Sequence, residues 1–108
     1  MIRVITIAFV SIVGLTSLAA AQSVEKGKEV YTTQKCSVCH SVGGVGNKKG
    51  ALDTVGSKLT AADIRNWIVD APGMAAKVKA DRKPPMKAYT TLAKDDLDNL
   101  VAYLQTLK

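Results

Sequence analysis

Two cysteines and a histidine lie within five consecutive residues of this 108-residue chain, in Cys36-Ser37-Val38-Cys39-His40. On a helical turn, residues three and four positions apart lie on one face, so both thiols and the imidazole can point the same way. Each thiol can then add across a vinyl group of a haem to form a thioether, and the imidazole can bind the iron. The spacing therefore predicts one covalently attached haem c, with Cys36 and Cys39 as its thioether links and His40 as an axial ligand.

Three other uses of these cysteines fit the sequence less well. A thioredoxin-like dithiol would need a strand before the motif and a βαβ context, and neither is visible. A zinc ion would need four ligands in tetrahedral geometry, but His40 is the only histidine, Cys36 and Cys39 are the only cysteines, and two of these residues are adjacent. A disulfide would close a very small loop and leave His40 without a role. Haem attachment uses all three side chains.

The N-terminal segment has the pattern of a secretory signal. A short positive start at Met1-Ile2-Arg3 precedes an almost wholly apolar run from Val4 to Leu18, and Ala19-Ala20-Ala21 offers small residues to a signal peptidase. We therefore assign residues 1–21 to a signal peptide and residues 22–108 to a monohaem domain, exported to a bacterial periplasm. Because the apolar run only just reaches the length that spans a bilayer, an uncleaved membrane anchor is the alternative.

The exported domain is expected to be all-α, with three main helices. Apolar residues recur in each at helical spacing. A capping pattern at Thr60 and Asp63 starts the second helix, and Pro72-Gly73 is expected to stop it. The glycine-rich stretch 43–56 shows no alternating strand pattern and is expected to be a loop. The predicted helices cover residues 23–34, 60–71 and 94–107.

A domain of this size is marginal for a core made of protein alone. A haem would add a large apolar surface for side chains to pack against. Trp67 is expected mainly in this packing, although its indole N–H could instead reach a haem propionate. The side chains expected to pack against the haem are Leu52, Leu59, Ile64, Trp67 and Leu104.

The sequence narrows the choice of the second axial ligand. With one histidine in the chain, a bis-histidine haem is impossible within it. Met86 is the favoured ligand, because the prolines before it in Lys83-Pro84-Pro85-Met86-Lys87 fix an extended chain that can hold a thioether against a flat ring. Met74 follows Pro72-Gly73 and has the character of a packing residue. A lysine, a water molecule or an open site are the remaining alternatives.

The chain resembles the class I c-type cytochromes of the short bacterial kind over Val24 to Leu107. This resemblance implies that the first and last helices cross and wrap one haem, with one haem edge exposed. It also implies axial ligation by His40 and Met86, and contact of Gly27 and Tyr31 with Leu100 and Tyr103. The matching pieces are Gly27, Tyr31, Cys36-Ser37-Val38-Cys39-His40, Gly50-Ala51-Leu52, Pro84-Pro85-Met86 and Leu100-Val101-Ala102-Tyr103-Leu104.

Two positions depart from that family's pattern. Where the family often has a proline after the glycine of the loop that supports the histidine, this chain has Ala51. The loop is then less rigid, so support of the His40 ring by a backbone carbonyl is less assured. The last helix often starts with Ser or Thr, but here Ala93 follows Leu92, which predicts a weak N-terminal cap.

These residues predict a soluble one-electron carrier rather than an enzyme. Histidine and methionine together would fill the coordination sphere of the iron and leave no site for a gas or a substrate. No acid–base pair or nucleophile stands out, so no catalytic residue is assigned. Two alternatives are a haem-based sensor or gas binder, with an open or labile distal site, and an electron-entry subunit of a larger redox complex.

The charge pattern predicts how the protein docks with its redox partners. The chain carries a formal net charge of +6, and residues 41–94 hold ten basic and four acidic side chains. A basic collar near an exposed haem edge would steer transient docking of donor and acceptor redox proteins with acidic surfaces, although a merely solubilising surface is the alternative. We expect a monomer that binds no nucleic acid and meets membranes only through partner complexes or an uncleaved anchor. The basic residues nearest to Met86 are Lys77, Lys79, Arg82, Lys83 and Lys87.

Overall fold

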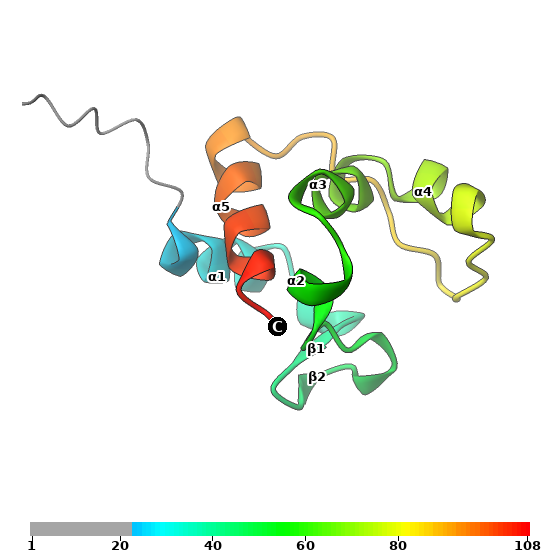
Figure 1. Ribbon diagram of the computed structural model, residues 1–108, viewed down its shortest axis with the longest axis horizontal. Helices are drawn as coiled ribbons and strands as arrows, with labels where there is room; N and C mark the ends of the chain where they lie inside the picture. Colours follow the sequence, from blue (N-terminus) through cyan, green and yellow to red (C-terminus); the bar gives the residue numbers. More distant parts are fainter. Residues whose placement is uncertain (1–22) are drawn as a thin grey trace, which may run out of the picture.

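The computed structural model describes residues 23–108, so the predicted signal peptide lies outside the described residues. The described part is mostly helical, which confirms the predicted all-α fold (Figure 1). None of its helices combines the length and the apolar character needed to cross a bilayer. Along the chain, the helices, strands and 3-10 turns (η) are α1 (Val24–Thr33), η1 (Cys36–Val38), β1 (Ser41–Val42), β2 (Val45–Gly46), η2 (Lys48–Gly50), α2 (Val55–Lys58), α3 (Ala61–Val69), α4 (Ala71–Val78) and α5 (Lys94–Gln105).

Helices α1 and α5 cross in close contact (Figure 1). A Cβ atom on Gly27 would collide with the carbonyl oxygen of Asn99 and lie 2.6 Å from the Cβ of Tyr103, so only glycine allows this approach. The ring of Tyr31 meets the ring of Tyr103 edge to face, with centroids 5.8 Å apart and planes at 74°. Leu100 belongs to the same buried cluster. The predicted crossing of the first and last helices is therefore confirmed.

Helix α3 packs against α5 and completes the buried cluster. An ion pair also joins these two helices, because Arg65 of α3 donates to the carboxylate of Asp98 in α5. Lys94 lies one turn before Asp98, and its Nζ donates to Oδ2 of the same carboxylate at 2.7 Å. Hydrogen bonds from Lys94, which has the larger effect, and from Arg65 hold the pKa of Asp98 below its ordinary value. The cluster comprises Val30, Tyr31, Ile64, Ile68, Leu97, Leu100, Val101, Tyr103 and Leu104.

The middle of the chain contains a helix, α4, that the sequence did not predict. The capping box of Thr60 and Asp63 starts α3 as expected, but α4 begins at once after α3 ends, where a loop was expected. Pro72 lies in the first turn of α4, where its missing N–H costs nothing. The side chain of Asp70 accepts a hydrogen bond from the Gly73 N–H at 3.2 Å and so caps the new helix. Pro72-Gly73 thus lies in the first turn of a second helix instead of ending the chain's helical middle.

The stretch expected to be a plain loop contains short regular elements. Strands β1 and β2 form an antiparallel hairpin, η2 follows, and α2 begins at the end of this stretch. Gly43 and Gly44 connect the strands with φ values of 58° and 80°, a left-handed path that suits a two-residue hairpin turn. Each strand has only two residues, so no alternating pattern could reveal it in the sequence.

A long irregular segment, residues 79–93, carries the chain from α4 back to α5 and contains Met86 (Figure 1). The backbone N–H of Tyr89 donates to the carbonyl of Ile68 at 2.8 Å, which ties this segment to α3. At its end Ala93 gives α5 no side-chain cap, as predicted. Asp95 and Asp96 in the first turn supply favourable negative charge instead.

The Gly27 contact predicts a strong effect of one added methyl group. Gly27→Ala should lower the free energy of unfolding of the haem-loaded protein by about 1–3 kcal/mol, because α1 and α5 must move apart. Lys26→Ala, on an exposed position of the same helix, should change it by less than about 0.5 kcal/mol. Urea unfolding followed by circular dichroism measures both, and equal stability of the two variants would contradict the close crossing.

Candidate haem-binding site

A pocket of about 630 Å³ lies between α1, α3, α5 and the segment of residues 79–93. Its volume falls within the range of about 300–1,000 Å³ that is usual for small-molecule and cofactor sites. Apolar side chains dominate its wall. All five side chains expected to pack against a haem line it, namely Leu52, Leu59, Ile64, Trp67 and Leu104. Trp67 is only half-buried, so it belongs to the pocket wall and not to the buried cluster.

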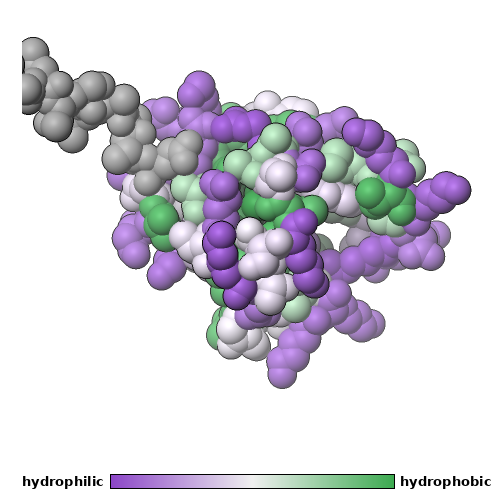
Figure 2. Space-filling model, viewed as in Figure 1, coloured by the Kyte–Doolittle hydropathy of each residue, from purple (hydrophilic) through white to green (hydrophobic). Residues whose placement is uncertain are grey.

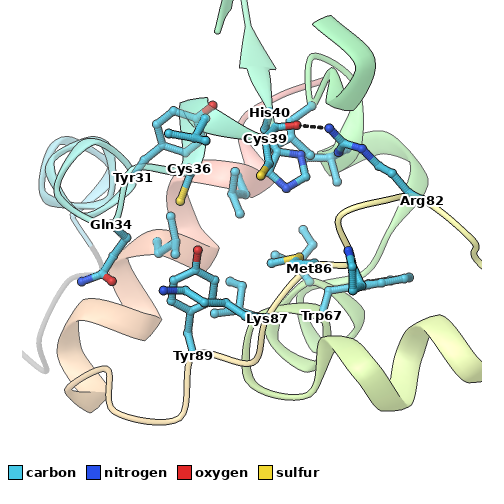
Figure 3. A pocket seen from close by; sticks show the side chains of 18 of the residues that line it. Tyr31, Gln34, Cys36, Cys39, His40, Trp67, Arg82, Met86, Lys87 and Tyr89 are labelled. Carbon is cyan, nitrogen blue, oxygen red and sulfur yellow. Dashed lines mark hydrogen bonds between the residues drawn. The ribbon is translucent and has the colours of Figure 1, made fainter. Parts of the chain in front are cut away.

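The Cys36–His40 motif forms a tight turn that faces this pocket. Lys35 takes a left-handed conformation, with φ of 56°, and so turns the chain after α1. The N–H groups of Cys39 and His40 then both donate to the carbonyl of Cys36, at 3.1 Å and 2.9 Å. Cys36, Cys39 and His40 all line the pocket, as the spacing predicted (Figure 3).

Asn47 fixes this turn from the hairpin side, a role that the sequence analysis missed. Its backbone N–H donates to the carbonyls of Ser37 and His40, at 3.1 Å and 2.9 Å. Its side-chain amide donates to the carbonyl of Val38 at 3.3 Å. Three carbonyls of the motif are therefore held by one residue, which limits the freedom of the turn.

The imidazole of His40 is oriented by the backbone. Its Nδ1 lies 2.9 Å from the carbonyl oxygen of Gly50, and since a carbonyl only accepts, Nδ1 must carry the proton. The other nitrogen, Nε2, then keeps its lone pair for a metal. Burial, and more weakly the cation of Arg82, lowers the pKa of His40 and favours this neutral form, although the Gly50 bond acts the other way. Ala51 in place of proline has not removed the supporting carbonyl.

The cysteine environment disfavours the alternative uses of the motif. No disulfide joins Cys36 and Cys39. Burial raises the pKa of Cys36, whereas a redox-active dithiol depends on a lowered one. Within residues 23–108, no three His, Cys, Asp or Glu side chains gather as a metal site would require.

Met86 lines the pocket and lies across it from His40 (Figure 3). Its side chain is half-buried. Met74, the other methionine considered, lies in α4 and is not part of the pocket wall. Lys35 and Lys87 do border the pocket, so lysine is still an alternative to be tested.

Two tyrosines add uncharged polar groups to the wall, and the sequence analysis gave neither a role in the pocket. Burial raises the pKa of Tyr31 to about 12, and its hydroxyl has no hydrogen-bond partner within the described residues. Burial also raises the pKa of Tyr89, so both rings stay neutral at physiological pH. Lys87 Nζ lies 4.9 Å from the centroid of the Tyr89 ring, which keeps this cation at the rim.

The wall and its volume fit a haem. Apolar side chains dominate the wall, so an empty pocket would leave this surface in contact with water. A large apolar partner in the pocket would bury that surface and stabilise the fold. A c-type haem uses two thiols for its covalent links and can take an imidazole and a thioether as iron ligands, and all of these groups border the same space.

The fold and the motif at its apolar pocket define a class of small helical proteins with a covalently attached haem. The family model described as Cytochrome c matches residues 24–108, and the chain belongs to this family. This confirms the resemblance to short class I c-type cytochromes and implies haem c as the cofactor and haem-based electron transfer as the general function. Cytochrome c domains are typically exported and act with redox partners.

A curated relative shares part of its length with this chain. Cytochrome c oxidase subunit 2 of Alkalihalophilus pseudofirmus is 28% identical over 92 residues, which cover 77% of this chain but 25% of that protein. The chain thus spans about a quarter of the relative's length. No solved structure matches the chain.

The pocket predicts that the fold depends on the attached haem. The double variant Cys36→Ala/Cys39→Ala, produced without haem, should be largely unfolded by circular dichroism because its apolar pocket lacks a partner. Ser37→Ala, an exposed change within the same motif, should attach haem and fold normally. A native-like spectrum of the haem-free double variant would show that the protein core suffices alone.

Proposed function

We propose that this protein is an exported electron carrier in which Cys36 and Cys39 bind haem c through thioethers and His40 and Met86 are the axial ligands. The observation that carries this proposal is that these four side chains, drawn from opposite sides of the fold, border one pocket. The supported ring of His40 offers Nε2 to a metal, and the thioether of Met86 is the sulfur donor across the pocket from it. Residues 1–21 would serve as the signal peptide that brings the chain to the periplasm.

The chain's own residues then hold the site in one geometry. When bound, haem c supplies an iron that takes up and releases one electron. His40 and Met86 would fill both axial positions, which excludes a gas or a substrate and argues against the sensor alternative. The apolar wall would keep water away, and the methionine thioether would favour the reduced iron. No step of this function requires a catalytic side chain.

The partners we propose are donor and acceptor redox proteins with acidic docking surfaces. Lys35, Arg82 and Lys87 border the pocket and are exposed, and no Asp or Glu of the described residues belongs to its wall. Hydrophilic side chains also dominate the face seen in Figure 2, with apolar ones in smaller areas between them. A positive rim around the site speeds encounter with a negative surface more than it strengthens the complex.

A second candidate function is electron entry into a larger redox complex. The partial match to a cytochrome c oxidase subunit favours it, because that relative is by its name one part of a larger redox complex. An electron-entry module would differ from a free carrier by stable co-purification with an oxidase, reductase or dehydrogenase. Recovery of the native protein alone, after mild extraction, would favour the free carrier.

Ligation by Met86 predicts a specific spectroscopic loss. Met86→Ala should keep the covalent haem but lose the thioether-to-ferric-iron absorption band, because its sulfur is gone. Met74→Ala should keep the band, since Met74 lies outside the pocket wall. A band that survives Met86→Ala would assign the ligand elsewhere and remove the proposed carrier site.

The same ligation predicts an order of events in unfolding. A bond from Met86 to the iron closes the long loop between His40 and Met86, which costs about 3 kcal/mol of loop entropy beyond a constant. The covalent attachment at Cys36 and Cys39 lies next to His40 and closes no such loop. The methionine band should therefore fade at a lower urea concentration than helicity and the haem's remaining bands. Simultaneous loss of all signals in every condition would contradict this order.

The basic rim predicts a salt effect on electron transfer. With an acidic redox protein as partner, the second-order rate should fall by tenfold or more between about 10 mM and 500 mM salt, because screening removes the steering. Stopped-flow absorption measures this rate. A rate that does not change with salt would indicate that the lysines keep the protein soluble and do not steer its partners.

A further inference from the structure

Arg82 links the two sides of the pocket. Its guanidinium donates to the backbone carbonyl of Cys39, 43 residues away in the sequence (Figure 3). It also lies against Gly50, where a Cβ atom would collide with the guanidinium as well as with the carbonyl of Cys39. Cys39 directly precedes His40, and Gly50 holds the His40 ring. One cation from the Met86 side therefore rests on the two backbone groups that flank His40.

The link lies close to Met86 along the chain. Three residues separate Arg82 from Met86, and two of them are prolines, whose rings fix φ. A hydrogen bond at Arg82 therefore restricts where Met86 can lie far more than it would through a flexible linker.

Met86 lies between two attachments of its segment. On one side Arg82 holds Cys39, and on the other the Tyr89 N–H donates to Ile68 at 2.8 Å. Among the described residues, these are the hydrogen bonds that join residues 81–92 to the rest of the protein. Loss of the Arg82 bond would leave the whole N-terminal half of this segment without a polar attachment.

We propose that Arg82 is a positioning residue that clamps the Met86 segment to the backbone beside His40 and so keeps the methionine within reach of the iron. This rests on the proposed axial ligation by Met86. Arginine suits the task because its planar fork presents several N–H donors and stays charged at any physiological pH. A lysine at this position could also donate and would keep the same charge, but it lacks the planar fork.

A competing role for Arg82 is that of one more positive charge on the docking surface. The two roles differ in what they control. A docking charge affects encounter with a partner and leaves the isolated protein unchanged, whereas a clamp changes the equilibrium between bound and released Met86 in the isolated protein.

Imidazole in solution can measure that equilibrium in the intact, oxidised, haem-loaded protein. Imidazole binds where Met86 has left, so its apparent affinity rises in proportion to the released fraction. Arg82→Gln should bind imidazole about tenfold more tightly than the wild type, because an exposed charged hydrogen bond is lost. Arg82→Lys should fall between the two. Lys83→Gln removes the same charge from the neighbouring exposed residue and should match the wild type.

The outcomes separate the clamp from the proposed function. A wild type without the thioether-to-iron band would refute Met86 ligation, and the clamp with it. A wild type with the band, and equal imidazole affinity in Arg82→Gln and Lys83→Gln, would overturn the clamp alone. Should Arg82→Gln yield no haem-loaded protein, Arg82→Lys carries the test, with at least threefold tighter imidazole binding expected and wild-type affinity contradicting the proposal.

Discussion

The chain surrounds an apolar space that its own side chains do not fill, and the rest of the structure follows from this constraint. Helices α1, α3 and α5 supply the buried cluster, and several members of this cluster also form part of the pocket wall. These side chains border the pocket but do not fill it. A bound haem would therefore act as a structural part of the core as well as a cofactor, which explains how so short a chain can hold a defined fold.

The two sides of the pocket are built in different ways. On the His40 side, the attachment residues, the turn and the supporting carbonyl all come from residues 35–50, and short-range backbone hydrogen bonds fix them. On the Met86 side, an irregular segment depends on contacts with distant parts of the chain, such as that between Tyr89 and Ile68. Local structure thus supports one proposed ligand, and tertiary structure supports the other.

This difference also explains what the sequence could predict. The Cys36–His40 turn depends on local spacing, and the sequence showed it directly. The helix crossing at Gly27 joins distant parts of the chain and was expected only because of the resemblance to the class I c-type cytochromes. The missed helix α4 has Pro72 in its first turn. A proline can either end a helix or lie in the first turn of the next, and here the side chain of Asp70 caps the new helix. Asn47 and Arg82 act through contacts with backbone carbonyls. Because every residue has a carbonyl, the sequence does not show which one a side chain will contact. Arg82 in particular looks like one more surface cation until its partner 43 residues away is known.

The hydrogen bond between His40 and Gly50 has a consequence for how this loop can vary. Its acceptor is a main-chain oxygen, which every amino acid supplies, so this bond places no demand on the side chain of residue 51 as long as the path of the backbone is kept. Ala51 is an instance of that freedom. Gly50 itself is not free, because any larger residue would strike the Cys39 carbonyl. Tolerance to mutation at residues 50 and 51 should therefore depend on the space around each Cα and not on the chemistry of the side chain.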